Sequence, residues 1–260
     1  MLTITTWPDF LAELPPEPLI TSDDAVVFVG AGEVDGDQLR HWAAGRRIIA
    51  LDGGVEHVMA AGLTAAVVVG DMDSITTGGG GDNLVDIPRL MITDQFSTDF
   101  EKALAAVKAP LILGFGLLGR RFDHSLAALH AMGGGLPKGK VVLISPDDAV
   151  IFSRGEITLS LPPGARLSVW PLTRQRFKSS RGLHWPLDGL TLAAGQVIGT
   201  SNRVAAHLDD SKRDGSKRDD GAQQVVITPE QPGDGPGDGP ADGMLVMVDP
   251  EHAEALIQSR

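Results

Sequence analysis

The sequence predicts an α/β protein with an N-terminal parallel-sheet domain and a smaller all-β sandwich domain after it. Up to about residue 150, short and almost continuously apolar strands alternate with helical segments. This pattern is typical of a parallel, Rossmann-like sheet that helices cover on both faces. Beyond residue 150, short runs are separated by turn residues, which is typical of a β-sandwich. We therefore expect one domain over residues 1–150 and another over residues 151–260.

Apolar runs, and the turn residues that end them, give the elements of the first domain in order. A lead-in of residues 1–24 contains a proline cluster. The predicted strands cover residues 25–29, 47–51, 65–69, 89–93, 111–113 and 141–145. The predicted helices cover residues 38–44, 55–61, 99–107 and 125–132. Since open parallel sheets bind ligands at the carboxyl ends of their strands, the residues after these strands are the candidates for a functional site.

The second domain is predicted from shorter runs and contains one biased segment. Its expected strands cover residues 156–161, 166–171, 190–192, 196–200 and 244–248. Residues 209–243 are of low complexity and include the unit Ser-Lys-Arg-Asp twice. Such a composition buries too little apolar surface to offset the entropy of ordering, so we expect much of this insertion to be mobile. Within it, residues 224–227 are a candidate strand.

The composition excludes several classes of function. The 260 residues are 42% hydrophobic, enough for one large or two small domains. The absence of cysteine excludes disulfides, thiolate zinc sites and cysteine nucleophiles. A net charge of −12 disfavours nucleic acid and anionic membranes as partners. The sequence shows no signal peptide and no apolar run of the roughly 20 residues that span a bilayer, so we expect a cytoplasmic protein.

Two carboxylates follow the third predicted strand, in Gly70-Asp71-Met72-Asp73-Ser74. Residues i and i+2 of an extended chain point the same way, so Asp71 and Asp73 can face one cation. Such a pair suits a hard divalent ion, most often Mg²⁺ carrying a polyphosphate. A lone Asp-x-Asp is equally compatible with a solvated turn, and it also occurs in the metal-diphosphate site of glycosyltransferases.

A second candidate site lies at a predicted helix start. Thr98 and Glu101 fit a capping box, which explains them structurally. Asp99 and Lys102 share a face of the same helix, and the capping box does not explain them. Because a helix N-terminus favours an anion such as phosphate, this pair is a candidate for phosphate or metal binding.

A glycine-rich loop follows the fifth predicted strand, with the sequence Gly114-Phe115-Gly116-Leu117-Leu118-Gly119-Arg120-Arg121-Phe122-Asp123-His124. Glycines let backbone N–H groups approach phosphate oxygens, and arginine can bind them bidentately. The loop also contains the literal G-x-G-x-x-G of dinucleotide-binding folds, so an NAD-binding domain is one alternative. The basic and acidic continuation is no part of that fingerprint and favours polyphosphate and metal.

Five carboxylates fall at predicted strand ends or helix starts on one edge of the sheet. They are Asp52, Asp71, Asp73, Asp99 and Asp123. Acids gathered in this way would repel one another strongly unless a cation neutralised them. Their convergence therefore predicts a metal-dependent enzyme that acts on a nucleotide.

These motifs resemble those of the thiamine pyrophosphokinase family, in order and in approximate spacing. The matching segments are Asp52-Gly53-Gly54, residues 70–74, Asp94-Gln95, residues 98–104, residues 116–124, residues 182–187 and residues 200–202. The resemblance covers roughly residues 25–205. The chain departs from the family at Leu51 and at residues 55–57, where the family usually has an alanine-like residue and an asparagine. It also has Gly119-Arg120-Arg121 where the family often has Gly-Gly-Arg.

The resemblance implies an ATP-dependent diphosphotransferase that makes thiamine diphosphate and AMP, as a homodimer with the active site at the subunit interface. It implies a catalytic set of Asp52, Asp71, Asp73, Asp99, Lys102, Arg121 and Asp123, in which Asp71, Asp73 and Asp99 bind Mg²⁺. The residues expected to contact ATP are Ser74, Thr98, Lys102, Gly116, Gly119, Arg121, Asp123 and His124. Those expected to contact thiamine are Gln95, Trp185, Ser201 and Asn202, with Trp185 stacking on the cationic thiazolium.

Two further functions remain open from the sequence. A pyrophosphokinase for a pterin alcohol, such as 6-hydroxymethyl-dihydropterin, could use the same Asp pair. A non-catalytic sensor could bind nucleotide or thiamine without turnover. Trp185 and the Ser201-Asn202 pair favour thiamine as the acceptor, and the full set of five acids favours an enzyme over a sensor.

Overall fold

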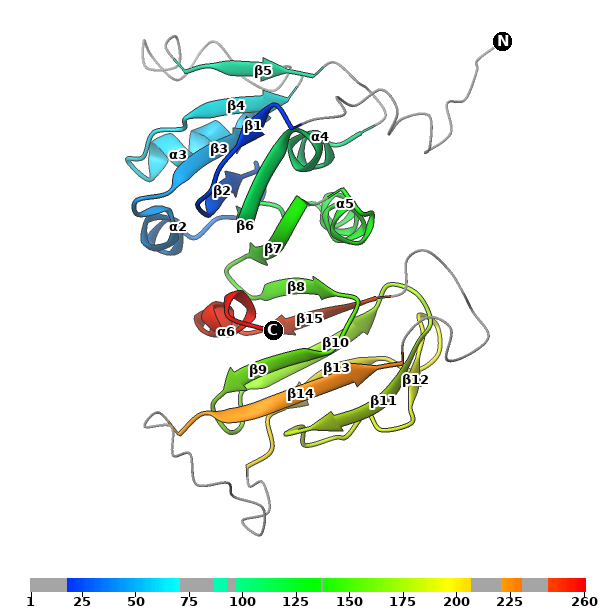
Figure 1. The fold of residues 1–260 in the computed structure, drawn as a ribbon. Coiled ribbons are helices and arrows are strands. Elements are labelled where there is room, and N and C mark those ends of the chain that lie inside the picture. The colour runs from blue at the N-terminus through cyan, green and yellow to red at the C-terminus, as the bar shows by residue number, and fades with distance from the viewer. Residues whose placement is uncertain (1–17, 71–86, 93–96, 137, 207–220, 231–242) are drawn as a thin grey trace, which may run out of the picture. The chain divides into compact units, whose positions relative to one another are not determined.

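The computed structural model describes residues 18–70, 87–92, 97–136, 138–206, 221–230 and 243–260 (Figure 1). The chain divides into two compact units, Met1–Pro146 and Asp147–Arg260. The α/β class expected from the sequence is confirmed, because the chain contains a large sheet in which parallel pairing dominates and a separate four-stranded antiparallel sheet.

The sheet of the first unit is parallel and has the strand order β7-β6-β2-β3-β4-β5. Its strands are β2 (Val26–Val29), β3 (Arg47–Leu51), β4 (Val67–Gly70), β5 (Arg89–Met91), β6 (Val107–Phe115) and β7 (Lys138–Ile144), and β1 (Ile20–Thr21) also pairs with β6. The chain fills one side of β2 first and then crosses to the other side. This is the order of a doubly wound sheet, with its topological switch point between β2 and β6.

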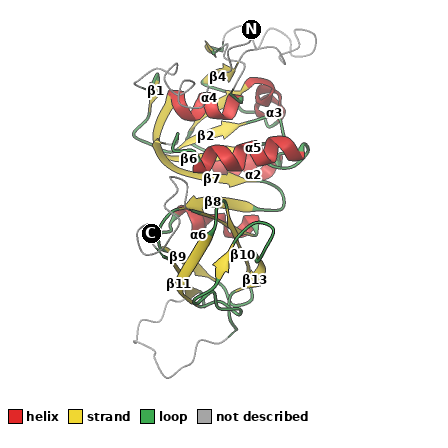
Figure 2. Ribbon diagram, turned by 90° about the vertical axis from the view of Figure 1, so that its right-hand side faces the viewer, coloured by secondary structure: helices red, strands yellow, loops and turns green. Residues whose placement is uncertain are grey.

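Helices cover both faces of this sheet. They are α2 (Gly36–Ala43), α3 (Val55–Ala60), α4 (Asp99–Ala106) and α5 (Phe122–Gly133), with the 3-10 turn η1 (Asp52–Gly54) leading into α3. Helices α2 and α3 lie on one face, and α4 and α5 on the other (Figures 1 and 2). All four residues of β2 are fully buried, which explains its continuous apolar run.

Every strand and helix predicted for the first unit is present, and the boundaries differ where local signals were weak. Strand β6 begins at Val107, four residues before the predicted start, and its register shifts between Lys108 and Leu111. The interruption follows from Pro110, which has no N–H to give to the ladder. Helix α5 begins at Phe122 instead of Ser125, because its N-cap residue Arg121 makes no side-chain cap that the sequence would reveal.

The second unit is built from antiparallel strands. Strands β8 (Ala149–Ser153), β15 (Met244–Val248), β10 (Arg166–Pro171) and β13 (Gly199–Arg203) pair in that order. Strands β9 (Ile157–Leu161), β14 (Gln223–Pro229), β11 (Gln175–Arg181) and β12 (Thr191–Leu192) form the separate four-stranded sheet. The chain ends in the turn η4 (Pro250–His252) and helix α6 (Ala253–Ile257), which contacts β8 and β9.

Two strands of the second unit were not predicted, and one was displaced. Strand β8 straddles the expected boundary at residue 150, and β11 carries Phe177 as its one large buried apolar side chain. The strand expected at residues 196–200 lies at 199–203, because Val197 and Ile198 are exposed instead of buried. Strand β14 confirms the strand suggested inside the biased segment. The mobility expected of that segment concerns residues 207–220 and 231–242, which lie outside the described residues.

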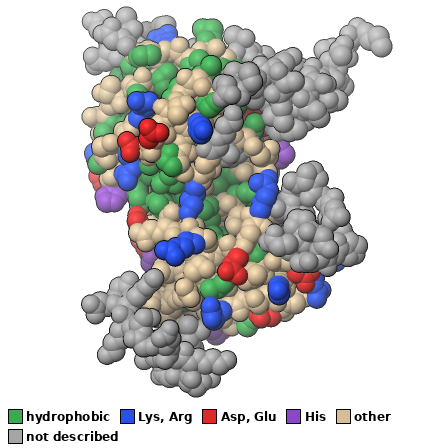
Figure 3. All heavy atoms as spheres, in the orientation of Figure 1, with side chains coloured by type: hydrophobic (Ala, Val, Ile, Leu, Met, Phe, Trp, Pro, Cys, Tyr) green, Lys and Arg blue, Asp and Glu red, His purple; other side chains and the backbone are tan. Residues whose placement is uncertain are grey.

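The described surface carries charges of both signs. Lys and Arg side chains occur beside Asp and Glu side chains on each unit, on the face that Figure 3 shows. Among the described residues, no helix is both long enough and apolar enough to cross a membrane.

Candidate functional site

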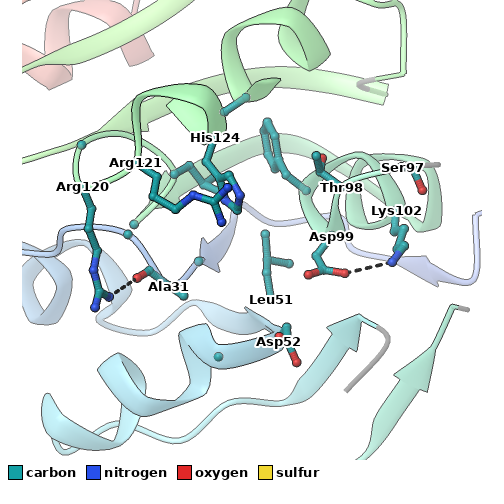
Figure 4. A pocket seen from close by; sticks show the side chains of 18 residues that line it. Ala31, Leu51, Asp52, Ser97, Thr98, Asp99, Lys102, Arg120, Arg121 and His124 are labelled. Carbon is teal, nitrogen blue, oxygen red and sulfur yellow. Dashed lines mark hydrogen bonds and ion pairs between the residues drawn. The ribbon is translucent and has the colours of Figure 1, made fainter. Parts of the chain in front are cut away.

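A pocket of about 510 Å³ opens at the carboxyl edge of the parallel sheet, a volume typical of small-molecule sites. Four segments line it, namely residues 30–32 after β2, residues 51–53 after β3, the start of α4, and the loop after β6 with the first turns of α5 (Figure 4). Because β2 and β6 flank the topological switch point, the pocket lies where doubly wound sheets bind their ligands.

Two glycine-containing loops, residues 30–32 after β2 and residues 116–119 after β6, form one wall of the pocket and are joined by backbone hydrogen bonds. We call them the two glycine loops. The Gly30 N–H donates to Phe115 O at 2.8 Å, and the Gly32 N–H donates to Gly116 O at 2.8 Å. A Cβ atom would lie 2.6 Å from Gly116 O if placed at Gly30, and 2.7 Å from it if placed at Gly32. Any larger residue at either position would therefore force the two loops apart. The sequence analysis identified the loop after β6 but missed the loop after β2. The signal for it was the pair of glycines directly after a buried strand.

Gly116→Ala is expected to lower the free energy of unfolding by about 2–4 kcal/mol, because it combines a left-handed backbone with a clash. Gly116 has a φ of 63°, and a Cβ there would lie 2.3 Å from Gly30 O. Urea unfolding measures the loss. Gly62→Ala is the matched control: Gly62 has a φ of 71° but open space around it, and should lose about 1 kcal/mol. Equal losses in both variants would show that the loops are not locked.

Asp52 is a buried carboxylate, and one of its oxygens has no hydrogen-bond partner in the described part of the chain. Its residue is 6% exposed, and its Oδ1 has no hydrogen-bond partner among the described residues. A Cβ at Gly70 would lie 3.1 Å from Asp52 Cβ and 3.2 Å from Asp99 Oδ1, so both acids lie against the end of β4. An orphaned carboxylate oxygen is costly, and a second acid nearby increases the cost. This donor set fits a divalent cation with oxygen ligands.

Four of the expected site residues belong to the segments 71–86 and 93–96. Asp71, Asp73, Ser74 and Gln95 lie outside the described residues. Gly70, which directly precedes Asp71, is described and lies against both Asp52 and Asp99.

Helix α4 presents a buried ion pair to the pocket. Lys102 is only 2% exposed, and its Nζ lies 3.1 Å from Asp99 Oδ1. The capping box is confirmed, because Thr98 Oγ1 accepts from the Glu101 N–H and the Glu101 carboxylate accepts from the Thr98 N–H. The capping box fixes the first turn of the helix, and this turn holds Asp99 and Lys102 at the edge of the pocket.

The loop after β6 contributes the glycines and two arginines to the pocket lining. Gly116, Gly119, Arg121 and His124 line it, as does Arg120. Arg121 donates from Nη2 and Nε to the two oxygens of Asp123, at 2.6 and 3.2 Å, and both side chains are largely exposed. The hydrogen bond from Arg121 holds the pKa of Asp123 below its usual range, and that pair raises the pKa of Arg121. Asp123 is not among the lining residues that the structure describes.

In the second unit, the structure brings the expected acceptor residues together. The side chain of Asn202 is buried, and it donates to Trp185 O at 2.7 Å and accepts from the Trp185 N–H at 3.1 Å. The Trp185 residue is 52% exposed. The Arg203 guanidinium lies 5.2 Å from the centroid of the indole, and the His184 ring packs edge-on against it at 4.4 Å. The sequence analysis missed both of these neighbours.

Strained backbone conformations occur at residues of the pocket and of the acceptor group in the second unit. Among the described residues, the non-glycine residues with a left-handed φ are Asp52 at 43°, Arg120 at 56° and Ser201 at 59°. Such residues gather at functional sites, where the surrounding structure holds them. Asp52 and Ser201 were expected site residues, and Arg120 was not.

The fold and site define a class of protein: a doubly wound α/β unit with an acidic, glycine-walled pocket at its switch point, followed by an antiparallel β unit. Comparison with known proteins makes this specific. The family described as "Thiamin pyrophosphokinase, catalytic domain" matches residues 39–139. Thiamine pyrophosphokinase 3 of Oryza sativa subsp. japonica is 29% identical over 161 residues, which are 53% of this chain and 58% of that protein. The chain thus matches less than two thirds of that relative's length.

Solved thiamin pyrophosphokinases share the fold. The enzyme from Candida albicans has a TM-score of 0.66 at 13% identity, over 91% of this chain and 95% of that chain. The enzyme from Bacillus subtilis has a TM-score of 0.62 at 18% identity, over 87% and 98% of the two chains. At such identities the likeness shows the fold alone. Together these findings confirm the resemblance to thiamine pyrophosphokinases that the sequence motifs indicated, over residues 39–139 in sequence and over most of the chain in fold.

Proposed function

We propose that the protein is a thiamine diphosphokinase, which transfers the diphosphoryl group of ATP to the hydroxyl group of thiamine and releases AMP. The observation that carries this proposal is the buried carboxylate of Asp52, whose Oδ1 has no hydrogen-bond partner among the described residues, near the Asp99–Lys102 pair in a glycine-walled pocket. The names of the relatives support thiamine as the acceptor.

Asp52 and Asp99 would hold Mg²⁺, together with Asp71 and Asp73 of the expected set. When bound, the ion neutralises polyphosphate charge as it develops during transfer. Lys102 orients Asp99 through its ion pair and offsets part of the acidic charge. The glycines of the two loops would let a polyphosphate approach the backbone of the pocket wall closely, and Arg121 would exchange Asp123 for a phosphate oxygen.

In the proposed reaction, the thiamine hydroxyl oxygen forms a bond to the β-phosphorus of ATP. The bond from that phosphorus to the oxygen bridging it to the α-phosphorus breaks, and this oxygen leaves with AMP. The hydroxyl proton passes to a carboxylate of the site acting as general base. Positioning and charge neutralisation account for most of the catalysis in such a transfer, so no covalent intermediate is needed.

On the acceptor side, we place thiamine on Trp185, with Ser201 and Asn202 beside it. The Trp185 residue is half-exposed, and an indole can bind an aromatic cation over its ring. The two hydrogen bonds between the Asn202 side chain and the Trp185 backbone, one donated and one accepted by Asn202, fix the chain that carries the indole. A homodimer that forms its active site between subunits is part of the proposal.

Trp185→Ala is expected to raise the KM for thiamine about tenfold, the loss expected for one cation–π contact, and to leave the KM for ATP unchanged. Trp185→Phe keeps an aromatic face and should lose less. Steady-state kinetics with each substrate varied in turn measures the split. A matching rise in both KM values would contradict the assignment of Trp185 to the acceptor.

An acceptor panel tests the proposed function. The protein is incubated with ATP and Mg²⁺ and with thiamine, 6-hydroxymethyl-dihydropterin or neither, and products are identified by mass spectrometry. We expect thiamine diphosphate and AMP, with no diphosphate on the pterin. Diphosphate on the pterin alone would move the assignment to that acceptor, and binding of thiamine without AMP would indicate a sensor.

A further inference from the structure

One cation in the pocket has no role in the proposed transfer. Arg120 lines the pocket, and no carboxylate of the described residues forms an ion pair with it. Its Nη1 donates instead to Ala31 O, 89 residues away in the chain, at 3.0 Å (Figure 4). The adjacent Arg121, by contrast, is held by Asp123. The two neighbouring arginines therefore have different partners: Arg120 binds a backbone carbonyl of another loop, and Arg121 binds a carboxylate of its own segment.

The backbone of Arg120 is strained to make this contact. Its φ of 56° lies in the left-handed region, which favours glycine. An arginine there costs stability relative to glycine, and such a cost persists where the surrounding structure or a function maintains it. The conformation directs the side chain away from its own loop and onto the loop after β2.

The bond from Arg120 completes the lock between the two glycine loops. Gly30 and Gly32 already donate from their backbone to Phe115 and Gly116. Ala31 lies between these two glycines, and its carbonyl receives the guanidinium. The loop after β2 is therefore fastened at three successive residues, and one of these ties comes from a side chain that substitution can remove.

We propose that Arg120 is a positioning residue for the nucleotide: it ties the loop after β2 to the loop after β6 and holds the pocket wall in the shape that binds a nucleoside triphosphate. The inference rests on the proposed function for the identity of that ligand. The tie itself is a property of the loops, whichever nucleotide is bound.

Three variants separate the tie from the strain. Arg120→Gly removes the guanidinium and the strain, Arg120→Ala removes the guanidinium alone, and Arg120→Lys keeps one charged donor. Calorimetric titration with ATP and Mg²⁺ should show about a fivefold to tenfold weaker affinity for the glycine variant, the loss expected when one solvent-exposed hydrogen bond of ordinary strength no longer holds the loop. The KM for ATP should rise with kcat changed less than about twofold, as for lost uniform binding.

Thermal unfolding supplies the readout that a merely structural role would not give. The glycine variant should melt at the wild-type temperature or above it, and the alanine variant below both. The lysine variant should recover part of the ATP affinity. Gly62→Ala, which forces an alanine into an existing left-handed φ at a residue outside the pocket lining, should lose stability and keep ATP affinity. Unchanged ATP affinity in the glycine variant, or a melting temperature that falls with it, would overturn the proposal.

Hydrogen exchange tests the tie without nucleotide. Amides of residues 30–34 should exchange faster in Arg120→Gly than in the wild type, and unchanged exchange would overturn the tie. ATP binding without any transfer to thiamine would count against the proposed function alone, because the affinity comparison still decides the role of Arg120. A wild type that fails to bind ATP would overturn the proposed function and the nucleotide role together.

Discussion

Asp52→Asn is expected to stabilise the metal-free protein and to lower turnover by about 100-fold or more. The substitution keeps the size of a side chain whose Oδ1 is buried without a partner among the described residues, and it removes a charge that lies near Asp99. Asparagine also tolerates the left-handed backbone of this position. The gain should be about 1–2 kcal/mol, because the cost of burying the charge disappears.

The prediction for Asp52→Asn also concerns the response of thermal stability to Mg²⁺. The ion should raise the melting temperature of the wild type, since a ligand that binds the folded state stabilises it, and should do so less in Asp52→Asn. Asp37→Asn removes an acid that is exposed on α2 and should change neither stability nor turnover appreciably. If Asp52→Asn proved less stable than the wild type without metal, the buried carboxylate would have a structural partner instead of a cation.

Lys102→Met is expected to destabilise the protein by about 2–4 kcal/mol, because it removes the cation from a largely buried ion pair with Asp99. Methionine keeps most of the packing of the lysine stem, so the loss reports on charge. The estimate is below that for a fully buried pair because Asp99 is 30% exposed. Chemical denaturation measures the change, and Lys108→Met, at an exposed position of β6, is the control.

Two further measurements link this loss to the acidic cluster. Mg²⁺ should restore part of the stability of Lys102→Met, because the ion replaces the missing positive charge. Adding Asp52→Asn to Lys102→Met should recover stability beyond the additive sum, since the two charges lie in one cluster. Strict additivity of the two substitutions would show that Lys102 does not compensate the cluster.

Much of the first unit follows from its sequence. Buried parallel strands are almost continuously apolar, so β2, β3 and β4 were identified from their runs of apolar residues. The capping box located the start of α4 to the residue, because Thr98 and Glu101 satisfy backbone groups locally. These features depend on residues close together in the sequence, so their prediction needs no knowledge of tertiary contacts.

The parts that could not be predicted depend on contacts between distant segments. Strand β11 has few buried apolar residues, so its pairing with β14 and β12 has little local signal. The bond between Arg120 and Ala31 joins residues 89 positions apart. The close approach of Gly30 to Gly116 likewise exists only once β2 and β6 are neighbours.

The candidate site likewise contains some features that the sequence predicted and others that it did not. The sequence indicated Asp52 and Asp99 as carboxylates of one edge and Lys102 as sharing a helix face with Asp99, and all three line one pocket. It did not indicate that Asp52 would be buried without a hydrogen-bond partner in the described part of the chain, or that Asp123 would pair with Arg121 outside the lining. Burial and pairing depend on packing, which a motif does not contain.

The most direct test of the proposed function follows the β-phosphorus of ATP. The protein is supplied with Mg²⁺, thiamine and ATP that carries a label on its β-phosphate. The account predicts that the label appears in thiamine diphosphate, with one AMP formed for each, and that a chelator abolishes both products. Label retained in ADP, or released as free diphosphate with no thiamine diphosphate formed, would contradict it.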